Sequence, residues 1–334
     1  MPPNDLANRL IRPDRYGELG VPHDALRWLR ENDPIHWTEA DGFRPFWAIT
    51  THADLLEVES QPDVFSNAAG GVVVTSSEGR RSLRSQVVAR VRPFLSDAVR
   101  QRLSTFRPDG AFRPIVQMDP PDHHVYRRVT RAFFTPGGIA EQQDLVAQAT
   151  AEVLDAVRRS TDQFDFVDVV GRRQPLLVLS RLLGLDETQT EEVLFLTVSH
   201  YEGESSPNGV SAGEERERWT RLIDQIVDDR RRRPSDDLAS LLANATVDGQ
   251  SMPTPELRGY FLILFTAGHD TTGHSLAGAI DAFIDNPGEF DRLRRDESLI
   301  ATAVEEIVRW TTPVNYMKRT ALRDYRLSNV DIAK

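Results

Sequence analysis

Apolar and polar positions alternate with helical spacing along most of the chain beyond residue 121. Apolar residues recur every three or four positions there, and this period predicts amphipathic helices. The predicted helices cover 123–134, 141–160, 174–183, 188–201, 213–232, 236–245, 255–285, 289–296 and 299–310. Two shorter helices are predicted earlier, over 24–32 and 53–60.

Two hairpins are predicted near the ends of the chain. Asp41-Gly42 separates two short apolar-rich segments, and Asp-Gly is a strong signal for a tight turn between strands. The tail RTALRDYRLSNVDIAK alternates in polarity and turns at Ser328-Asn329. The sequence therefore predicts a mainly α fold with a small β portion drawn from both ends. No repeat or shift in composition divides it, so we expect a single domain over residues 1–334.

Charge and cysteine content narrow the classes of protein. The 334 residues carry a formal net charge of −11, which argues against nucleic-acid binding. There is no cysteine, and this excludes disulfides, zinc–thiolate sites and cysteine nucleophiles. No apolar run is long enough to span a membrane, and the first residues lack the apolar segment of a signal peptide. We expect a cytoplasmic protein.

The longest predicted helix contains an unusual polar stretch. Residues 261–265 are apolar on every face, which is typical of a buried helix, but the sequence then continues as AGHDTTGH. Two alternatives stay open. Either one helix ends at Gly268 and Asp270 caps the next, or a single helix opens locally and presents the hydroxyl of Thr271 and the carboxylate of Asp270 to a ligand.

Two other readings of this stretch can be excluded. Gly273-His-Ser-Leu-Ala277 approaches the nucleophile elbow of the α/β-hydrolases, but that motif needs a strand before the serine and a histidine after it, and this chain has neither. His269 and His274 are five residues apart, so they do not share a helix face as a pair of zinc ligands would.

Two further clusters carry charge. In DPPDHHVYRR and the residues after it, His123, Arg127 and Arg131 are spaced to lie on one helix face, which suits a ligand with carboxylates; a solvated basic face is the simpler alternative. In EEIVRW, Glu306 and Arg309 are three residues apart on an otherwise apolar helix, where they can form an ion pair.

Taken together and in this order, LFTAGHDTT, DPPDHHVYRR and EEIVRW resemble the cytochrome P-450 monooxygenases of the soluble bacterial type. The resemblance covers essentially the entire chain. It implies the fold of that family, a triangular helical prism with a long central helix. It also implies haem as the cofactor.

The resemblance assigns roles around the central helix. Thr271 would bond to the iron-bound dioxygen and Asp270 would help to relay protons to it. Ala267 would border the haem and the substrate pocket, together with Val314 and the segment 66–117. Glycines 268 and 273 would open a slot for the oxygen.

It assigns further roles at the edge of the haem. His123, Arg127 and Arg319 would hold the haem propionates through charge-assisted hydrogen bonds. Glu306 and Arg309 would form a buried ion pair that supports the haem-side core.

The chain departs from the family at the iron. In that family a cysteine thiolate holds the iron, on a glycine-rich loop downstream of the second hairpin. This sequence has no cysteine and stops at Lys334. We therefore expect a C-terminally incomplete chain that lacks the haem-loop region and the metal ligand, does not stably bind haem and is inactive.

For the complete protein we expect a monooxygenase that inserts one atom of O₂ into an apolar small molecule, such as a terpenoid, a sterol or another lipid-like compound. Its electrons would come from a ferredoxin-type partner. The alternative is a haem-free relative that binds and activates a partner enzyme such as a glycosyltransferase. The intact AGHDTT segment argues against that alternative, and a thiolate-type spectrum of the reduced CO complex would exclude it.

Overall fold

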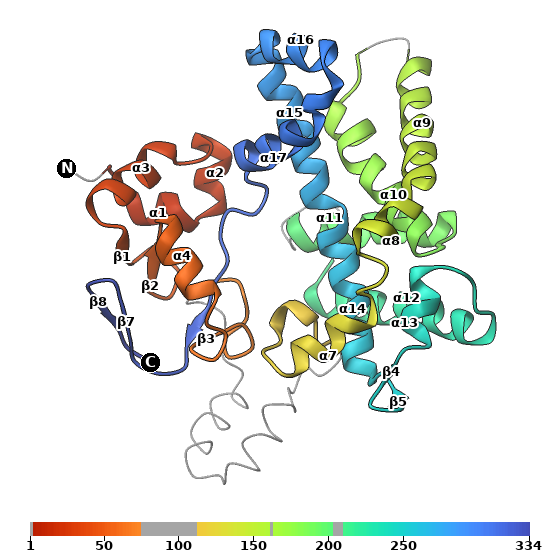
Figure 1. The fold of residues 1–334 in the computed structure, drawn as a ribbon, viewed down its shortest axis with the longest axis horizontal. Helices are drawn as coiled ribbons and strands as arrows, with labels where there is room; N and C mark the ends of the chain where they lie inside the picture. Colours follow the sequence, from red (N-terminus) through yellow and green to blue (C-terminus); the bar gives the residue numbers. More distant parts are fainter. Residues whose placement is uncertain (1–2, 75–111, 161–162, 203–209) are drawn as a thin grey trace. The chain divides into compact units, whose positions relative to one another are not determined.

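The computed structural model describes residues 3–74, 112–160, 163–202 and 210–334. The chain divides into two compact units, each described here by itself (Figure 1). Unit 1 comprises Met1–Pro108, Gln117–Pro120 and Tyr316–Lys334, and unit 2 comprises Asp109–Val116 and Pro121–Asn315. The described strands form only two-stranded antiparallel pairs, so the predicted mainly α class is correct.

Unit 1 combines short helices with strands from both ends of the chain. Its elements are α1 (Leu6–Ile11), α2 (Pro13–Leu19), α3 (His23–Asn32), β1 (Ile35–Thr38), β2 (Phe46–Ile49), α4 (His52–Glu59), β3 (Phe65–Ser66), β6 (Thr320–Ala321), β7 (Tyr325–Leu327) and β8 (Val330–Ile332). The hairpins β1–β2 and β7–β8 match the two that the sequence predicts.

Apolar burial joins the two ends of the chain within unit 1. Phe65 of β3 pairs with Ala321 of β6, and its ring meets that of Tyr325 edge to face at 5.1 Å. Leu327 and Ile332 are buried in the same cluster as Phe65. Because these contacts join distant parts of the sequence, the last strands are an integral part of the core of unit 1.

Unit 2 is almost entirely helical (Figure 1). Its long elements are α9 (Gln143–Arg159), α10 (Arg173–Leu182), α11 (Glu187–Glu202), α12 (Ala212–Arg232), α14 (Thr254–Gly268), α15 (Asp270–Asp285) and α17 (Ile300–Thr311). Its shorter elements are α7 (Asp122–Val129), α8 (Pro136–Glu141), α13 (Leu238–Ala243), α16 (Pro287–Arg295), the 3₁₀ turns η2 (Ile115–Gln117, which ends in unit 1) and η4 (Glu297–Leu299), the π-helical turn η3 (Val167–Arg172), and the pair β4 (Thr246–Val247) and β5 (Gln250–Ser251).

Three features of unit 2 differ from the sequence prediction. The helix predicted over 123–134 ends at Val129, and the helix predicted over 255–285 is divided at His269. The pair β4–β5 turns at Asp248-Gly249, where both residues adopt positive φ. This is the same Asp-Gly signal that marks the first hairpin, but it lies between strands of two residues that have no pattern of their own.

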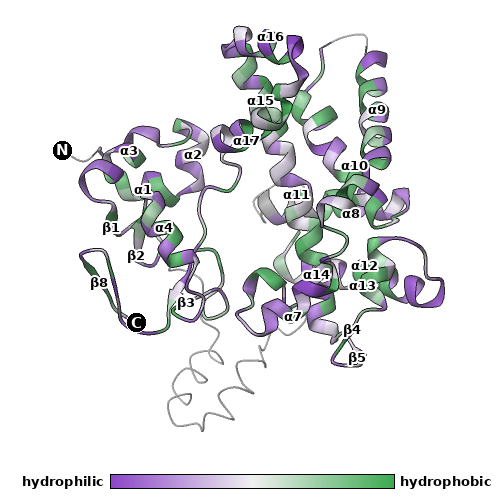
Figure 2. Cartoon of the chain, viewed as in Figure 1, coloured by the Kyte–Doolittle hydropathy of each residue, from purple (hydrophilic) through white to green (hydrophobic). Residues whose placement is uncertain are grey.

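The core of unit 2 is built on α14. Phe261 and Phe265 are fully buried one turn apart, and the ring of Trp219 from α12 stacks on Phe265 with centroids 5.5 Å apart. Figure 2 shows the hydrophobic stretch of α14 among helices that carry both hydrophobic and hydrophilic residues, of which α10, α11 and α12 contact it. Burial of such large rings contributes most of the packing energy of a helical core.

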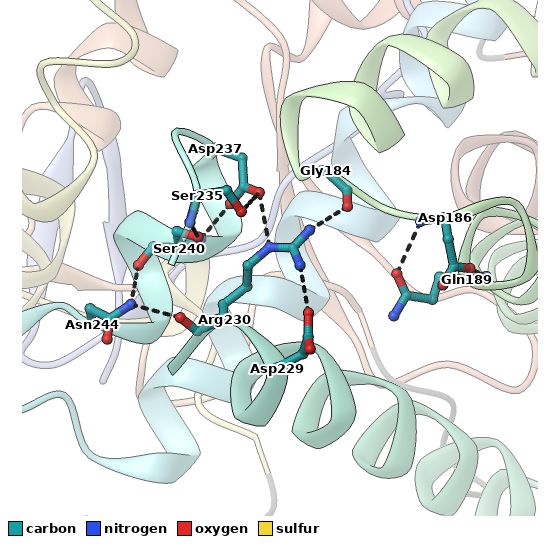
Figure 3. Close-up of polar contacts among 9 residues, drawn as sticks. All are labelled: Gly184, Asp186, Gln189, Asp229, Arg230, Ser235, Asp237, Ser240 and Asn244. Atoms are coloured by element: carbon teal, nitrogen blue, oxygen red, sulfur yellow. Dashed lines mark hydrogen bonds and ion pairs between the residues drawn. The ribbon is translucent and has the colours of Figure 1, made fainter. Parts of the chain in front are cut away.

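One arginine joins the turn after α10 to the turn before α13 (Figure 3). Arg230 of α12 donates from Nε to Asp237 at 2.9 Å, from Nη1 to Asp229 at 2.8 Å, and from Nη2 to the carbonyl oxygen of Gly184. Asp237 in turn accepts the backbone N–H of Ser240 at 2.6 Å, as the N-cap of α13. Gly184 has a φ of +62°, and a Cβ at this residue would collide with the carboxylate of Asp237. The guanidinium therefore satisfies polar groups on both turns.

We expect Arg230→Ala to lower the free energy of unfolding by about 2–3 kcal/mol. The side chain is only 14% exposed, and its loss leaves the carboxylate of Asp237 and the carbonyl of Gly184 without their charged donor. Chemical denaturation measures the change. Arg232→Ala, on the exposed end of the same helix, is the control and should leave stability unchanged; equal effects of the two substitutions would contradict the assigned role.

Candidate functional site

The polar stretch in the central helix is an interruption between two helices. α14 ends at Gly268 and α15 begins at Asp270, while His269 has the non-helical angles φ −124° and ψ −37°. α15 continues the course of α14 (Figure 1). The cap position of α15 is His269 and not Asp270, and the His269 side chain makes no capping hydrogen bond. The helix boundaries are therefore those of the alternative with two helices, although Asp270 is not the cap residue. The interruption is also a local opening of the helix, as in the other alternative.

Side chains around the interruption bond to backbone carbonyls one turn earlier. The hydroxyl of Thr271 donates to the carbonyl of Ala267 at 3.2 Å, and His269 Nδ1 lies 2.9 Å from the carbonyl of Phe265. Asp270 lies in the first turn of α15, where its negative charge interacts favourably with the helix dipole, and its carboxylate is 3.8 Å from Nδ1 of His274. The structure thus brings the predicted residues Ala267 and Thr271 into contact, with Asp270 beside them.

The two glycines of this stretch serve helix packing. A Cβ on Gly273 would lie 2.5 Å from the carbonyl oxygen of Gly171 in η3, and a Cβ on Gly268 would lie 3.3 Å from the side chain of Leu179 in α10. The backbones of α15 and η3 therefore pack without an intervening side chain. The sequence-based expectation that these glycines open a slot for oxygen is not needed to explain them. Gly273 allows close contact with η3, and Gly268 allows close contact with α10.

Gly273→Ala should destabilise the protein by roughly 1–3 kcal/mol, because the added methyl group overpacks a contact with backbone atoms that cannot move independently. Gly288→Ala in α16 is the matched control, since a Cβ there meets nothing within 4 Å. Thermal unfolding of both variants measures the difference. A neutral Gly273→Ala variant would show that the crossing of α15 and η3 is loose.

His269 is the buried histidine of the interruption, with 2% of its surface exposed. A carbonyl oxygen only accepts hydrogen bonds, so Nδ1 must carry a proton and donate to Phe265. Burial lowers the pKa of His269 below its ordinary value, although the bond to Phe265 and the charge of Asp270 act in the opposite direction. The neutral Nδ1–H form is therefore the native one near neutral pH.

This lowered pKa predicts a loss of stability in acid. Below about pH 6.5 the unfolded chain protonates His269 before the folded chain does, so the free energy of unfolding falls as the pH decreases from there toward the folded-state pKa. Denaturation of the protein and of His269→Asn between pH 7.5 and 5 tests this. The stability of the wild type should fall more steeply than that of the variant, and parallel curves would contradict the prediction.

The helix with the predicted cations, α7, is attached to α14 at both of its ends. Before α7, Arg113 donates to Asp122 at 2.5 Å and to Glu256 at 3.0 Å. After it, the hydroxyls of Thr130 and Tyr260 share a buried hydrogen bond of 2.6 Å. Burial raises the pKa of Tyr260, which keeps this phenol protonated. Sequence patterns do not predict the bonds to α14, because Arg113–Glu256 and Thr130–Tyr260 each join residues more than a hundred positions apart.

Two of the three residues predicted to share one helix face lie in α7. His123 is half-buried and its ring meets that of His124 edge to face, while Arg127 is exposed. Arg131 lies beyond the end of α7 at Val129, so the predicted third cation on the same face is wrong. α7 ends at Val129, and the residues after it form turns.

The predicted ion pair of α17 is present but exposed. Arg309 donates two hydrogen bonds of 2.6 Å to Glu306. The two side chains are 64% and 59% exposed, so the expectation of a buried pair is wrong for these residues. Ile300, Val304 and Val308 expose an apolar stripe on the same helix.

The remaining predicted residues lie in other parts of the chain. Arg319 belongs to unit 1, where its guanidinium donates to Glu59 and to the carbonyl of Lys318. Val314 is half-exposed in unit 2. Residues 75–111 of the predicted pocket segment 66–117 lie outside the described residues.

The described part of unit 2 contains a cavity of about 430 Å³ between α15, α16 and α17, lined by apolar side chains that include Phe283, Leu293 and Ile307.

Known proteins similar to this chain identify its class. No protein-family model matches it. It is 30% identical to cytochrome P450-terp of Pseudomonas sp, over 99% of this chain and 76% of that protein, and 29% identical to linalool 8-monooxygenase of Pseudomonas putida, over 97% and 76%. The crystal structure of CYP108D1 from Novosphingobium aromaticivorans DSM12444 matches with a TM-score of 0.79 at 28% identity, covering 100% of this chain and 77% of that one.

The chain therefore belongs to the cytochrome P-450 family, and both the predicted family and its fold are confirmed. It spans about three quarters of the length of these relatives. The family is one of haem-containing monooxygenases, so the protein is an oxidoreductase by class. No helix among the described residues has the length and apolar character needed to cross a membrane.

The residues present fit one part of a haem site and not another. The exposed Arg127 and the half-buried His123 on an anchored helix suit carboxylates, and beside the interruption at His269 the residue Ala267 is exposed and Thr271 is partly accessible. The sequence contains no cysteine, and the described residues contain no group of three acidic, histidine or cysteine side chains that could hold a metal ion. Residues 1–334 thus do not supply the thiolate that holds the iron in this family.

Proposed function

We propose that this protein is a haem-dependent monooxygenase, and that residues 1–334 contribute the oxygen-activating and propionate-binding side of the site but not the iron ligand. The observation that carries the proposal is the interruption at His269, which places the partly accessible Asp270 and Thr271 in the first turn of α15, directly after the buried stretch of α14. The haem, when bound, supplies the chemistry of O₂ binding and reduction.

The proposed roles follow from the contacts of each side chain. The Thr271 hydroxyl donates its one hydrogen to the carbonyl of Ala267, so its oxygen lone pairs remain able to accept a hydrogen bond, and it would donate to a ligand by giving up the bond to Ala267. The carboxylate of Asp270, one residue earlier and partly accessible, can hold and pass a proton. His123 and Arg127 would bind the propionates. Arg319 would join them if its guanidinium exchanged Glu59 for a propionate.

The proposed substrate is an apolar small molecule of the terpenoid, sterol or lipid class. The name of linalool 8-monooxygenase supports a terpenoid among these, because that relative is 29% identical over nearly all of this chain. The electrons would come from a ferredoxin-type donor. Residues 1–334 would belong to a single P-450 domain, with Ala267 at the cofactor and the Glu306–Arg309 pair supporting the haem-side core.

A chimera tests this function. Residues 1–334 are joined to the segment of CYP108D1 that carries its haem-ligating cysteine, and the product is compared with the 334-residue chain. We expect the chimera to take up haem and give a thiolate-type spectrum of the reduced CO complex, and the unextended chain to give none. With linalool, O₂ and a ferredoxin-type donor, the chimera should form an oxygenated product.

Thr271→Ala in the chimera should keep substrate binding but reduce product formed per electron roughly tenfold or more, since proton delivery is lost. Thr272→Ala is the matched control, an exposed threonine on the next position. Unchanged coupling in Thr271→Ala would remove that residue from the mechanism. A folded chimera that takes up no haem would overturn the monooxygenase proposal in favour of a haem-free helper.

A further inference from the structure

His269 occupies the one non-helical position between Gly268 and Asp270, and it bonds to both helices. Its imidazole donates to the carbonyl of Phe265 in α14, 2.9 Å away. Its own carbonyl accepts the N–H of Gly273 in α15, at 2.8 Å. The ring is almost completely buried, so it has little freedom to leave this position.

The bond to Phe265 has a direct consequence for the backbone. In an unbroken α-helix the carbonyl of residue 265 accepts the backbone N–H of residue 269. Here the side chain of the same residue bonds to that carbonyl, and its φ of −124° departs from the helical value by roughly 60°. A side chain that bonds to the carbonyl one turn earlier competes with the helical ladder in this way.

We propose that His269 is a positioning residue whose Nδ1–H holds the helix interruption open and thereby sets the orientation of Asp270 and Thr271. This inference rests on the proposed function for its catalytic meaning, but its structural part stands on the geometry alone. The packing of Gly268 on Leu179 and of Gly273 on Gly171 fixes the two helix ends on either side. The side chain of His269 then determines the backbone conformation of this one residue between the two helices.

The chemistry required is a neutral N–H donor at a given place. Asparagine presents an amide N–H at a position close to that of Nδ1, whereas leucine fills similar space with no donor and favours a continuous helix. His269→Leu should therefore release the carbonyl of Phe265 to the backbone N–H of residue 269. The helix would then run through the interruption and turn Thr271 relative to α14.

Hydrogen exchange of the 334-residue chain measures this without any cofactor. In His269→Leu, the amides of residues 269–271 should exchange more slowly than in the wild type by a factor on the order of ten, and His269→Asn should retain wild-type exchange. Thr266→Val is the matched control, because it removes the same kind of bond, from Thr266 to the carbonyl of Leu262 at 2.9 Å, inside a regular helix. The ¹⁵N shifts of the imidazole should report the Nδ1–H tautomer.

Two outcomes would overturn the inference: exchange in His269→Leu equal to that of the wild type, or an Nε2–H tautomer. The first would show that the glycine contacts alone impose the interruption. In the haem-bearing chimera, His269→Leu should lower product formed per electron and His269→Asn should restore it. A folded chimera that takes up no haem, whatever the exchange data, would refute the proposed function and not the structural role of His269.

Discussion

The contact between the bare backbones of Gly171 and Gly273 is the constraint on which the arrangement of unit 2 depends. It lets the π-helical turn η3 approach α15 to a distance that no side chain would allow. A π-helical turn widens the backbone locally, and such turns occur often near functional sites. Once α15 is held against η3, and Gly268 against α10, His269 is the one residue between the two helices. The packing fixes the helices on both sides of the interruption, and the bond of the His269 side chain to Phe265 acts on the residue between them.

α14 serves as the common support for the other candidate groups. Trp219 and Phe265 anchor it in the core, while Arg113 and the Thr130–Tyr260 bond attach α7 to it at two places. Buried hydrogen bonds of this kind are costly to break, since removal of one partner leaves the other unsatisfied. The orientation of α7, and with it the placement of His123 and Arg127, is thus coupled to the same helix that leads into Asp270 and Thr271.

The sequence could predict most of the long helices, the two hairpins and the motif at residues 267–274, because each has a local pattern of period or turn chemistry. It could not predict the attachment of α7 to α14 or the role of the glycines, since these depend on Tyr260 and Gly171, which are distant in sequence. The sequence excludes His269 and His274 as a pair of zinc ligands and indicates no other role for His269. Its position between an apolar run and an acid carries no signal of the bond to Phe265, which exists only once the helix is interrupted.

The exposure of α17 shows how a motif can be present while its expected environment is not. The Glu306–Arg309 pair forms with good geometry, yet solvent surrounds it, and Ile300, Val304 and Val308 expose an apolar stripe on the same helix. In water such a pair contributes little, because each charge is already well solvated. The pair becomes strong only if apolar groups cover α17 and exclude water from it. Local sequence therefore specifies the partners of this interaction, whereas its strength depends on what packs over the helix.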